Sequence, residues 1–310
     1  LSNSDASSQN PFATCKYSSK KYGYDESSVL KSGMILTGRV GAIGQTSIVP
    51  SFWEKRKAMG SDNIIRIAVK PECKNGLIYA YLASKIGNLA FWKYATGGVQ
   101  PFITDAMVGK LPIPDFDLAI QERVDQLIQN SLNNKELAAE SINNAVAMLN
   151  EFCDISFSKS KGVKSSVVRA SSIKNSFNTR FDPPVFINDG VTALSSTRSF
   201  KLLKDCDIKM WYPGIFKRAY VKNGYPYIKS SSMFDADPFK SCDQLSKTRT
   251  PGLDELWLKE GMVLISCAGI CGQAKIITKE YSEKHAIGSP DIIRLISNDE
   301  LFTAEYLYAY

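Results

Sequence analysis

The sequence predicts an α+β protein in which two repeated mixed α/β domains, both incomplete, are joined by a long amphipathic helix. Three observations support this fold class. One stretch of the chain recurs 228 residues later, each copy contains a glycine-bounded hairpin pattern, and the segment between the copies has helical periodicity. We expect residues 1–116 to form the later part of the first domain, 117–155 the helix, and 156–310 the early and middle part of the second domain.

The repeat is clearest around two similar stretches, GMILTGRVGAIGQ from Gly33 and GMVLISCAGICGQ from Gly261. The same ungapped offset of 228 residues aligns Leu30 with Leu258. A period this long exceeds the roughly 20–50 residues of solenoid repeats, so it indicates two copies of a whole domain. Residues 178–229 have no counterpart in the first copy and 82–153 have none in the second, so we expect the chain to be a piece of a longer protein.

Each copy begins with a hairpin-like element. Residues 34–36 and 262–265 are apolar and short enough for buried strands, and a second apolar pair follows at 48–49 and 276–277. The glycines between them, at 41 and 44 or at 269 and 272, are typical of a tight turn. A phosphate-binding loop is not indicated, because neither copy contains the Gly-Lys-Ser/Thr that such a loop requires.

The connector between the copies is predicted to be one long helix. Apolar residues recur there at steps of three and four, while polar residues fill the other face. These apolar residues are Val124, Leu127, Ile128, Leu132, Ala138, Ile142, Ala145, Val146, Leu149 and Phe152. Pro112 and Pro114 precede the helix and set its start. A helix of roughly 50 Å is suited to a spacer or a coiled-coil partner, although a packing helix within one domain remains an alternative.

Composition limits the class of protein. A hydrophobic content of 44% and a charged content of 22% are typical of a globular chain, and the net charge of +7 favours a polyanionic partner. The seven cysteines show neither paired metal-binding spacing nor a disulfide framework, which favours a reducing compartment. We expect no membrane partner, because no apolar run reaches the roughly 20 residues that a membrane span needs.

The passage ATGGVQPFITDAMVGKLPIPDFDLAIQERV leads directly into the predicted helix. Together with the two hairpin-bearing copies, it resembles the DNA specificity subunit of type I restriction-modification systems, in which each target recognition domain ends in a similar pattern. The matching residues are Gly98, Gln100, Leu111, Ile113, Pro114, Gln121 and Val124. The stretch RFDPPVFI from Arg180 to Ile187 resembles the usual opening of the second recognition domain.

The resemblance implies a non-catalytic targeting protein of the bacterial or archaeal cytoplasm, without a cofactor. Each recognition domain would read one half of a bipartite site in double-stranded DNA, and the helix would hold the two readers at a fixed spacing. Methyltransferase and restriction subunits would be its partners and would carry out catalysis. A truncated form of such a subunit is also conceivable as a self-associating protein that rebuilds the two-fold arrangement.

A DNA reader needs basic side chains for phosphates and polar side chains for base edges. The candidates are Lys20, Lys21, Arg39, Lys55, Arg56, Lys57, Lys217, Arg218, Tyr220, Lys222, Lys229, Lys247 and Arg249. Arg39 is of special interest because its counterpart in the second copy is Cys267, and two readers of different half-sites should differ where they touch bases. A solvated surface role is the competing interpretation for each of these residues.

Three other functions compete with DNA recognition in the sequence. Asp182-Pro183-Pro184 is similar to the catalytic loop of adenine methyltransferases, but Val185 stands where that loop has an aromatic ring. The lone histidine, His285, is the counterpart of Lys57 and is expected in a loop, while Cys267 and Cys271 are expected as small turn residues rather than a metal pair. The alternative from another class is a protein-interaction scaffold that uses the long helix.

Overall fold

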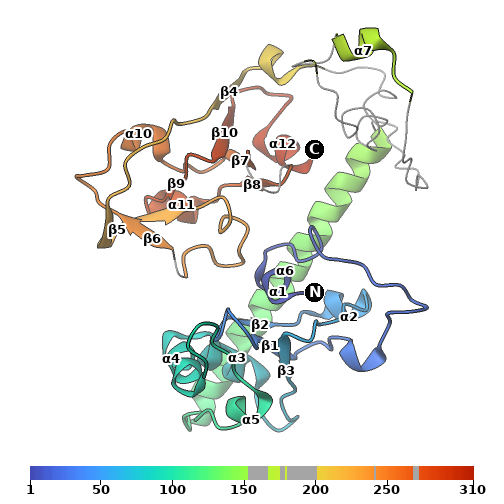
Figure 1. Ribbon diagram of the computed structural model, residues 1–310, viewed down its shortest axis with the longest axis vertical. Helices are drawn as coiled ribbons and strands as arrows, with labels where there is room; N and C mark the ends of the chain where they lie inside the picture. Colours follow the sequence, from blue (N-terminus) through green and yellow to red (C-terminus); the bar gives the residue numbers. More distant parts are fainter. Residues whose placement is uncertain (153–166, 175–178, 180–200, 241, 268–271) are drawn as a thin grey trace. The chain divides into compact units, whose positions relative to one another are not determined.

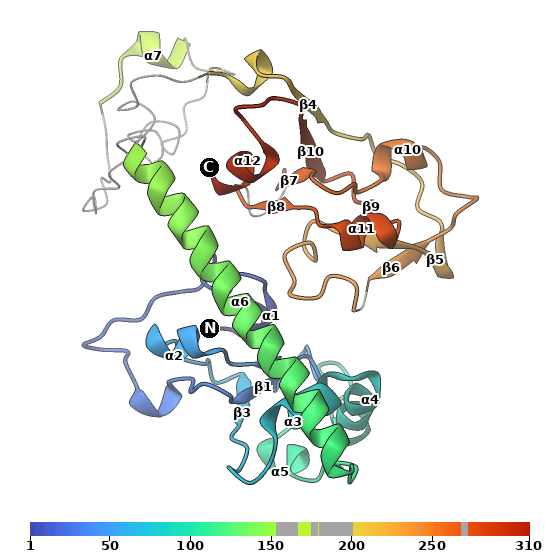
Figure 2. The same ribbon diagram turned by 180° about the vertical axis from the view of Figure 1, so that it is seen from behind.

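The computed structural model describes residues 1–152, 167–174, 179, 201–240, 242–267 and 272–310, and the chain packs as two compact units (Figures 1 and 2). Unit 1 comprises Leu1–Glu140 and Tyr220–Leu245, and unit 2 comprises Ser141–Ala219 and Ser246–Tyr310. The motif at 180–187 and residues 269 and 271 lie outside the described residues. The domain boundaries expected at 116 and 155 remain a prediction, since the units are defined by packing and the boundaries by the repeat.

The first part of unit 1 combines short helices with one antiparallel sheet. Its elements are α1 (Asn3–Ser7), η1 (Glu26–Ser28), β1 (Ile35–Gly38), β2 (Thr46–Ile48), α2 (Ser51–Lys55), β3 (Ile64–Ile67), α3 (Asn75–Ala83), α4 (Lys85–Tyr94) and α5 (Asp105–Val108). The strand order is β2-β1-β3, with Leu36 of the central strand opposite Ser47 on one side and Arg66 on the other. The predicted hairpin is therefore present, and a third strand completes it.

Two apolar clusters hold this part of unit 1 together. Leu36 and Trp53 belong to one cluster, while Ile35 and Phe91 belong to the other. Neighbouring residues of β1 thus point to opposite faces of the sheet, as strand geometry requires. Both faces of the short sheet are covered, which explains why the strand reads as a continuous apolar run in the sequence.

The described part of unit 2 repeats this arrangement. Its elements are α7 (Ala170–Lys174), η3 (Leu203–Asp205), β4 (Ile208–Trp211), α10 (Leu253–Leu256), β7 (Val263–Ser266), β8 (Ala274–Ile276), α11 (Lys279–Glu283), β9 (Ile287–Gly288), β10 (Ile292–Ser297) and α12 (Ala304–Ala309). The sheet has the order β4-β10-β7-β8. Strands β8, β7 and β10 correspond to β2, β1 and β3, and β4 adds an edge.

The two copies share hydrogen bonds as well as sequence. The amide of Val49 donates to the carbonyl of Met34 at 2.9 Å, and the amide of Ile277 donates to that of Met262 at 2.8 Å. The turn glycines also match, since Gly44 has φ +76° and Gly272 has φ +88°, a region that favours glycine. The interpretation of the repeat as one reused frame agrees with these contacts.

Lys57 and His285 occupy one special backbone position in the two copies. Each follows the short helix after the hairpin, α2 or α11, with φ values of 53° and 52°. The side chain of His285 lies against the Trp257 ring, with centroids 5.8 Å apart, and its Nδ1 is 3.1 Å from the Glu283 carbonyl oxygen. The structure thus places His285 in a turn after a helix, where the repeat predicted a loop residue.

The remaining part of unit 1 is an antiparallel pair, β5 (Tyr220–Ile228) and β6 (Asp243–Leu245), with the connection between them. This connection forms an isolated antiparallel bridge with the start of the chain, in which Ser8 lies opposite Asp235. Gln9 N–H donates to the Phe234 carbonyl at 2.8 Å. Ser8 stands three residues before Pro11-Phe12, and Asp235 stands three residues before the matching pair Pro238-Phe239, so the bridge joins equivalent positions of the two copies.

The predicted long helix is present as α6 (Leu118–Phe152), which has 35 residues. Asp117 caps its start, because the Ile120 amide donates to the Asp117 carboxylate at 3.0 Å. All of its residues are described and none is fully buried. Several apolar side chains of the predicted stripe are exposed, including Leu127 at 51% and Phe152 at 90%. The predicted fold class, repeated mixed domains with a long helix, is confirmed.

Polar contacts hold the first part of α6, residues 118–140, to the rest of unit 1. The Gly76 amide donates to the Asp125 carboxylate at 2.8 Å, and the Gln129 side chain donates to Asn75 at 2.9 Å. About two turns further along α6, the Glu136 carboxylate accepts a hydrogen bond from the Ser51 hydroxyl at 2.6 Å. These contacts fix which face of the helix meets α2 and α3.

Candidate nucleic-acid interface

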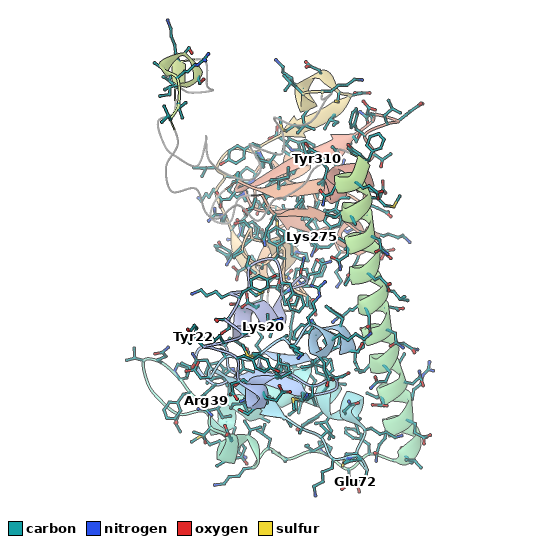
Figure 3. The ribbon with its side chains drawn as sticks, turned by 90° about the vertical axis from the view of Figure 1, so that its right-hand side faces the viewer. Lys20, Tyr22, Arg39, Glu72, Lys275 and Tyr310 are labelled. Atoms are coloured by element: carbon teal, nitrogen blue, oxygen red, sulfur yellow. The ribbon has the colours of Figure 1, made fainter. Side chains whose placement is uncertain are left out.

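A loop between α1 and η1 presents basic and aromatic side chains to solvent. Tyr17 is 89% exposed and Tyr22 is 82% exposed, and both lie beside exposed lysines at positions 16, 20 and 21. The Lys21 ammonium lies 4.9 Å from the centre of the Tyr22 ring, within cation–π range. Lys20 and Tyr22 are labelled in Figure 3. We call residues 16–24 the Lys-Tyr loop.

The tip of the Lys-Tyr loop is closed by its own hydrogen bonds. The Ser18 hydroxyl donates to the Gly23 carbonyl at 2.9 Å, and the Gly23 amide donates to the Ser19 carbonyl at 2.9 Å. These bonds join the two sides of the loop across Lys20, Lys21 and Tyr22. The three side chains are therefore presented from a closed turn rather than from an extended segment.

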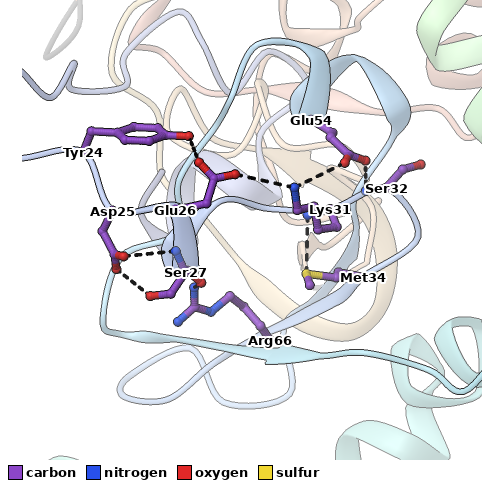
Figure 4. Close-up of polar contacts among 9 residues, drawn as sticks. All are labelled: Tyr24, Asp25, Glu26, Ser27, Lys31, Ser32, Met34, Glu54 and Arg66. Carbon is purple, nitrogen blue, oxygen red and sulfur yellow. Dashed lines mark hydrogen bonds and ion pairs between the residues drawn. The ribbon is translucent and has the colours of Figure 1, made fainter. Parts of the chain in front are cut away.

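A charged network anchors the end of this loop to the domain (Figure 4). Tyr24 donates a short hydrogen bond to Glu26, which pairs with Lys31 at 3.9 Å, and Lys31 pairs with Glu54 of α2 at 3.6 Å. This hydrogen bond to the Glu26 carboxylate raises the pKa of the Tyr24 phenol, because only the neutral phenol can donate it. The loop is thus tied to the helix that follows the hairpin.

Asp25 adds a second anchor beside this network. Its carboxylate accepts from the hydroxyls of Ser27 and Ser28, each at 2.7 Å, and these bonds lower its pKa. The Arg66 guanidinium on β3 donates to the Ser27 carbonyl at 2.8 Å. The end of the loop is consequently fixed to the sheet as well as to α2.

Lys57 lies beside the Lys-Tyr loop, whereas Arg56 lies against a residue that precedes it. The Lys57 ammonium is 5.8 Å from the centre of the Tyr24 ring, and the Arg56 guanidinium is 4.7 Å from that of Phe12. The structure therefore associates three of the predicted DNA-binding residues of the first copy with the loop: Lys20 and Lys21 on it, and Lys57 at its base.

Arg39 and Lys55, the other two candidates in the first copy, are engaged elsewhere. Arg39 forms an ion pair with Asp105 at 2.9 Å, at the first turn of α5, and Lys55 forms one with Glu136 of α6 at 3.0 Å. Both side chains keep solvent exposure, 43% for Arg39 and 73% for Lys55. Their DNA contacts stay a prediction, and each has a structural role beside it.

The candidates of the second copy occupy three places. Lys217 and Arg218 are exposed in the loop before β5, while Tyr220 and Lys222 are exposed on β5 itself. Lys229 follows β5 and pairs with Asp243 at 2.7 Å. Lys247 and Arg249 are exposed after β6, in the segment that corresponds to the Lys-Tyr loop, since both segments follow Pro-Phe-x-x-Cys, at 11–15 and 238–242.

Sequence reasoning missed Lys16 and the exposed tyrosines of the loop. The signal was present as the alternation of lysine and tyrosine in CKYSSKKYGY from Cys15 to Tyr24. Exposed aromatic rings among basic residues are typical of nucleic-acid-binding surfaces, because rings stack on bases while cations neutralise phosphates. The two lysines at 20 and 21 were recognised as a charge cluster only.

The metal and nucleophile alternatives concern other residues of the described part of the chain. No group of three or more histidine, cysteine, aspartate or glutamate side chains lies together there in a way that could hold a metal ion. Burial raises the pKa of the Cys242 thiol, which disfavours the thiolate needed for nucleophilic chemistry. Asp182-Pro183-Pro184 and Cys271 lie outside the described residues. None of the described helices combines the length and apolar character needed to cross a membrane.

Comparisons with solved structures found type I restriction-modification proteins. The chain is similar to the S subunit from M. genitalium, at 15% identity and a TM-score of 0.32, over 90% of this chain and 63% of that one. It is also similar to a chain from a structure of type I R-M complex assembly and conformational transition, at 16% identity and a TM-score of 0.28, over 90% and 65%. The HsdS subunit from Thermoanaerobacter tengcongensis matches at 13% identity and a TM-score of 0.27, over 86% and 60%.

The chain thus spans less than two thirds of the length of each of these structures. No protein-family model and no curated protein matches the sequence.

Proposed function

We propose that this chain is a sequence-specific DNA-binding specificity subunit of a type I restriction-modification complex. Each repeated domain reads one half of a bipartite target, and α6 sets the distance between the halves. The observation that carries this proposal is the reuse of one main-chain frame with different exposed loops. Lys20, Lys21 and Tyr22 precede the frame in the first copy, and Lys247 and Arg249 precede it in the second.

In this role the chain itself is not catalytic. Methyltransferase and restriction subunits carry out catalysis in the cytoplasm of a bacterium or archaeon, and the chain directs them to DNA. The net charge of +7 suits a duplex partner, since association through phosphates depends on positive charge. Surface lysines and arginines supply register, and polar or aromatic groups between them supply sequence discrimination.

The test is a map of methylated adenines in a methylation-free bacterial host. Cells that express the full-length gene with its neighbouring methyltransferase are compared with cells that express the methyltransferase alone. We expect a new split motif, with two short half-sites around a fixed gap, only when the chain is present. If a well-expressed complex adds no motif, the chain is not the reader.

The spacer role of α6 has its own test. Insertion of seven residues between Glu140 and Leu149 keeps the contacts at Asp125 and Glu136 and adds nearly two turns, or about 10 Å. Since each base pair advances the duplex by about 3.4 Å, we expect the gap to lengthen by about three base pairs with both half-sites unchanged. A gap that stays the same contradicts the spacer role.

The scaffold alternative is favoured by one feature, the exposed apolar side chains of α6. Leu137 is 61% exposed and Met148 is 70% exposed, as expected for a helix that packs on another protein. Salt dependence separates the two functions. DNA binding through several phosphates weakens with a log–log slope of roughly −0.9 per contact, whereas an apolar helix interface is nearly insensitive to salt.

A further inference from the structure

The Lys-Tyr loop combines two properties that a solvated loop does not need. Tyr17 and Tyr22 leave almost their whole rings in water, at 89% and 82% exposure, although large aromatic surfaces are normally at least partly covered. At the same time the loop is ordered by its own bonds between Ser18, Ser19 and Gly23. Ordering exposed rings in advance favours a partner, because less conformational entropy is lost on binding.

The charges around the rings identify the chemistry of that partner. Lys16, Lys20 and Lys21 are all exposed, and Lys57 lies against Tyr24 at the base of the loop. The acidic residues at the base, Asp25 and Glu26, are already occupied by hydrogen bonds and an ion pair within the domain. The outward face of the loop is therefore cationic and aromatic, which matches phosphates flanking base or sugar rings.

Comparison of the two copies shows that this loop differs while the turn that precedes it is the same. The segment after Cys242 has no tyrosine up to Leu258, and it carries Lys247, Thr248 and Arg249 instead. The hydrogen bonds that precede each loop are nevertheless the same, since Phe12 N–H donates to Asn10 Oδ1 and Phe239 N–H donates to Asp237 Oδ1. A shared turn followed by a different loop is expected of an element that reads a different half-site in each domain.

We propose that the Lys-Tyr loop is the base-reading element of the first domain, with Tyr22 and Tyr17 as specificity-determining residues. Lys20 and Lys21 contact the flanking phosphates, and the cation–π contact at 4.9 Å aligns the Tyr22 ring between them. The ring face packs on a deoxyribose or on a thymine methyl group in a groove of the duplex, and the hydroxyl exchanges hydrogen bonds with a base edge. This inference rests on the proposed function and assigns its contacts to particular side chains.

The test selects binding sites from random duplex DNA with the full-length protein that contains this chain, bound to its methyltransferase, and sequences the bound fraction. Five proteins are compared: wild type, Tyr17→Ala, Tyr22→Ala, Tyr22→Phe and the double variant Lys20→Ala with Lys21→Ala. Tyr212→Ala is the matched control, because Tyr212 is also exposed, at 52%, but lies before β5 in the second copy. Circular dichroism verifies that each variant is folded.

We expect Tyr22→Ala to lose preference at one or more base pairs of a single half-site by roughly 5- to 150-fold, the range for one good base contact. Tyr22→Phe separates the packing of the ring from hydrogen bonding, because it keeps the ring and removes the hydroxyl. The double lysine variant should keep the motif and reduce the salt slope by about 1.8, the value for two phosphate contacts. Tyr212→Ala should behave as wild type.

Three different results would refute either the role of the loop or the proposed function on which it rests. A wild-type motif and affinity retained by both Tyr22→Ala and Tyr17→Ala refutes the loop as a reader while leaving the proposed function intact. If a loop variant no longer co-purifies with the methyltransferase but still selects the wild-type motif, the loop is a protein-docking surface instead. If wild-type protein selects no split motif, the proposed function itself fails.

Discussion

Gly76 lies where α3 approaches the backbone of α6, and replacing it with alanine should weaken the packing between these two helices. An added Cβ would lie 2.6 Å from the Asp125 carboxylate oxygen and 3.0 Å from both Asp125 Cα and Ile128 Cβ. The carboxylate could turn away, but the Gly76 amide would then lose its acceptor. The α6 backbone cannot yield without a shift of the whole helix.

The expected cost follows from these two effects. Overpacking by a methyl group costs about 1–3 kcal/mol, and loss of a hydrogen bond to a charged group costs about 1.5–3 kcal/mol. The higher helix propensity of alanine offsets up to about 1 kcal/mol. We therefore expect Gly76→Ala to destabilise unit 1 by about 2–4 kcal/mol, which lowers Tm by roughly 5–15 °C in a unit of this size.

The assay is thermal unfolding together with hydrogen exchange of the peptide covering 75–83. Gly98→Ala is the control, since no heavy atom among the described residues lies within 4 Å of its added Cβ and its φ is not left-handed. That control should change stability by less than about 0.5 kcal/mol. Equal shifts in Tm for the two variants, with unchanged exchange in α3, would show that Gly76 is not a packing constraint.

Three further variants test other contacts. Glu136→Gln should lower the free energy of unfolding by about 0.2–1 kcal/mol above pH 4.5. Hydrogen bonds from Ser51 and Lys55 lower the Glu136 pKa below its ordinary 4.5, so the wild type loses this advantage as the pH falls through the lowered pKa. Unfolding of both proteins at pH 7 and pH 3 would measure the difference. Gln9→Pro removes the amide that donates to Phe234, so hydrogen exchange at 234–236 should rise, whereas Gln9→Ala should leave it unchanged. Lys57→Gly should stabilise unit 1 by about 1 kcal/mol by relieving φ 53°, and Lys57→Ala should not; equal melting temperatures would contradict the strain argument.

The sequence predicted the elements whose causes are local. The strands of the hairpin are continuous apolar runs ended by glycines, and the repeat doubled the number of observations that supported each one. The 35 residues of α6 were visible because periodicity accumulates with length. The third strand, β3, was not assigned to the hairpin, since its pairing with β1 joins residues such as Leu36 and Arg66 that are far apart in the chain.

The site could be predicted only in part, because long-range ion pairs decide which cations remain available. Arg39 and Asp105 are 66 residues apart, and Lys55 and Glu136 are 81 residues apart, so no local pattern reveals either pair. A similar contrast separates Arg66, which is exposed on β3, from its counterpart Arg294, which is buried and donates to the carbonyls of Gly288 and Ile292. Equivalent residues in two copies can therefore have different roles.

Reuse of the frame is compatible with different loops because the shared contacts depend little on side-chain identity. The bonds that repeat between the copies are mostly main-chain ones, such as Leu30 N–H to the Ala58 carbonyl and Leu258 N–H to the Ala286 carbonyl, at 2.8 and 2.9 Å. Where a side chain takes part, a different residue accepts the equivalent hydrogen bond. The Glu54 carboxylate accepts from the Ser32 amide, and the Ser282 hydroxyl accepts from the Glu260 amide. A loop outside this set of bonds can change its sequence without a change in the fold. Differences between the copies should consequently be concentrated in loops such as 16–24, where they alter recognition and leave stability nearly unchanged.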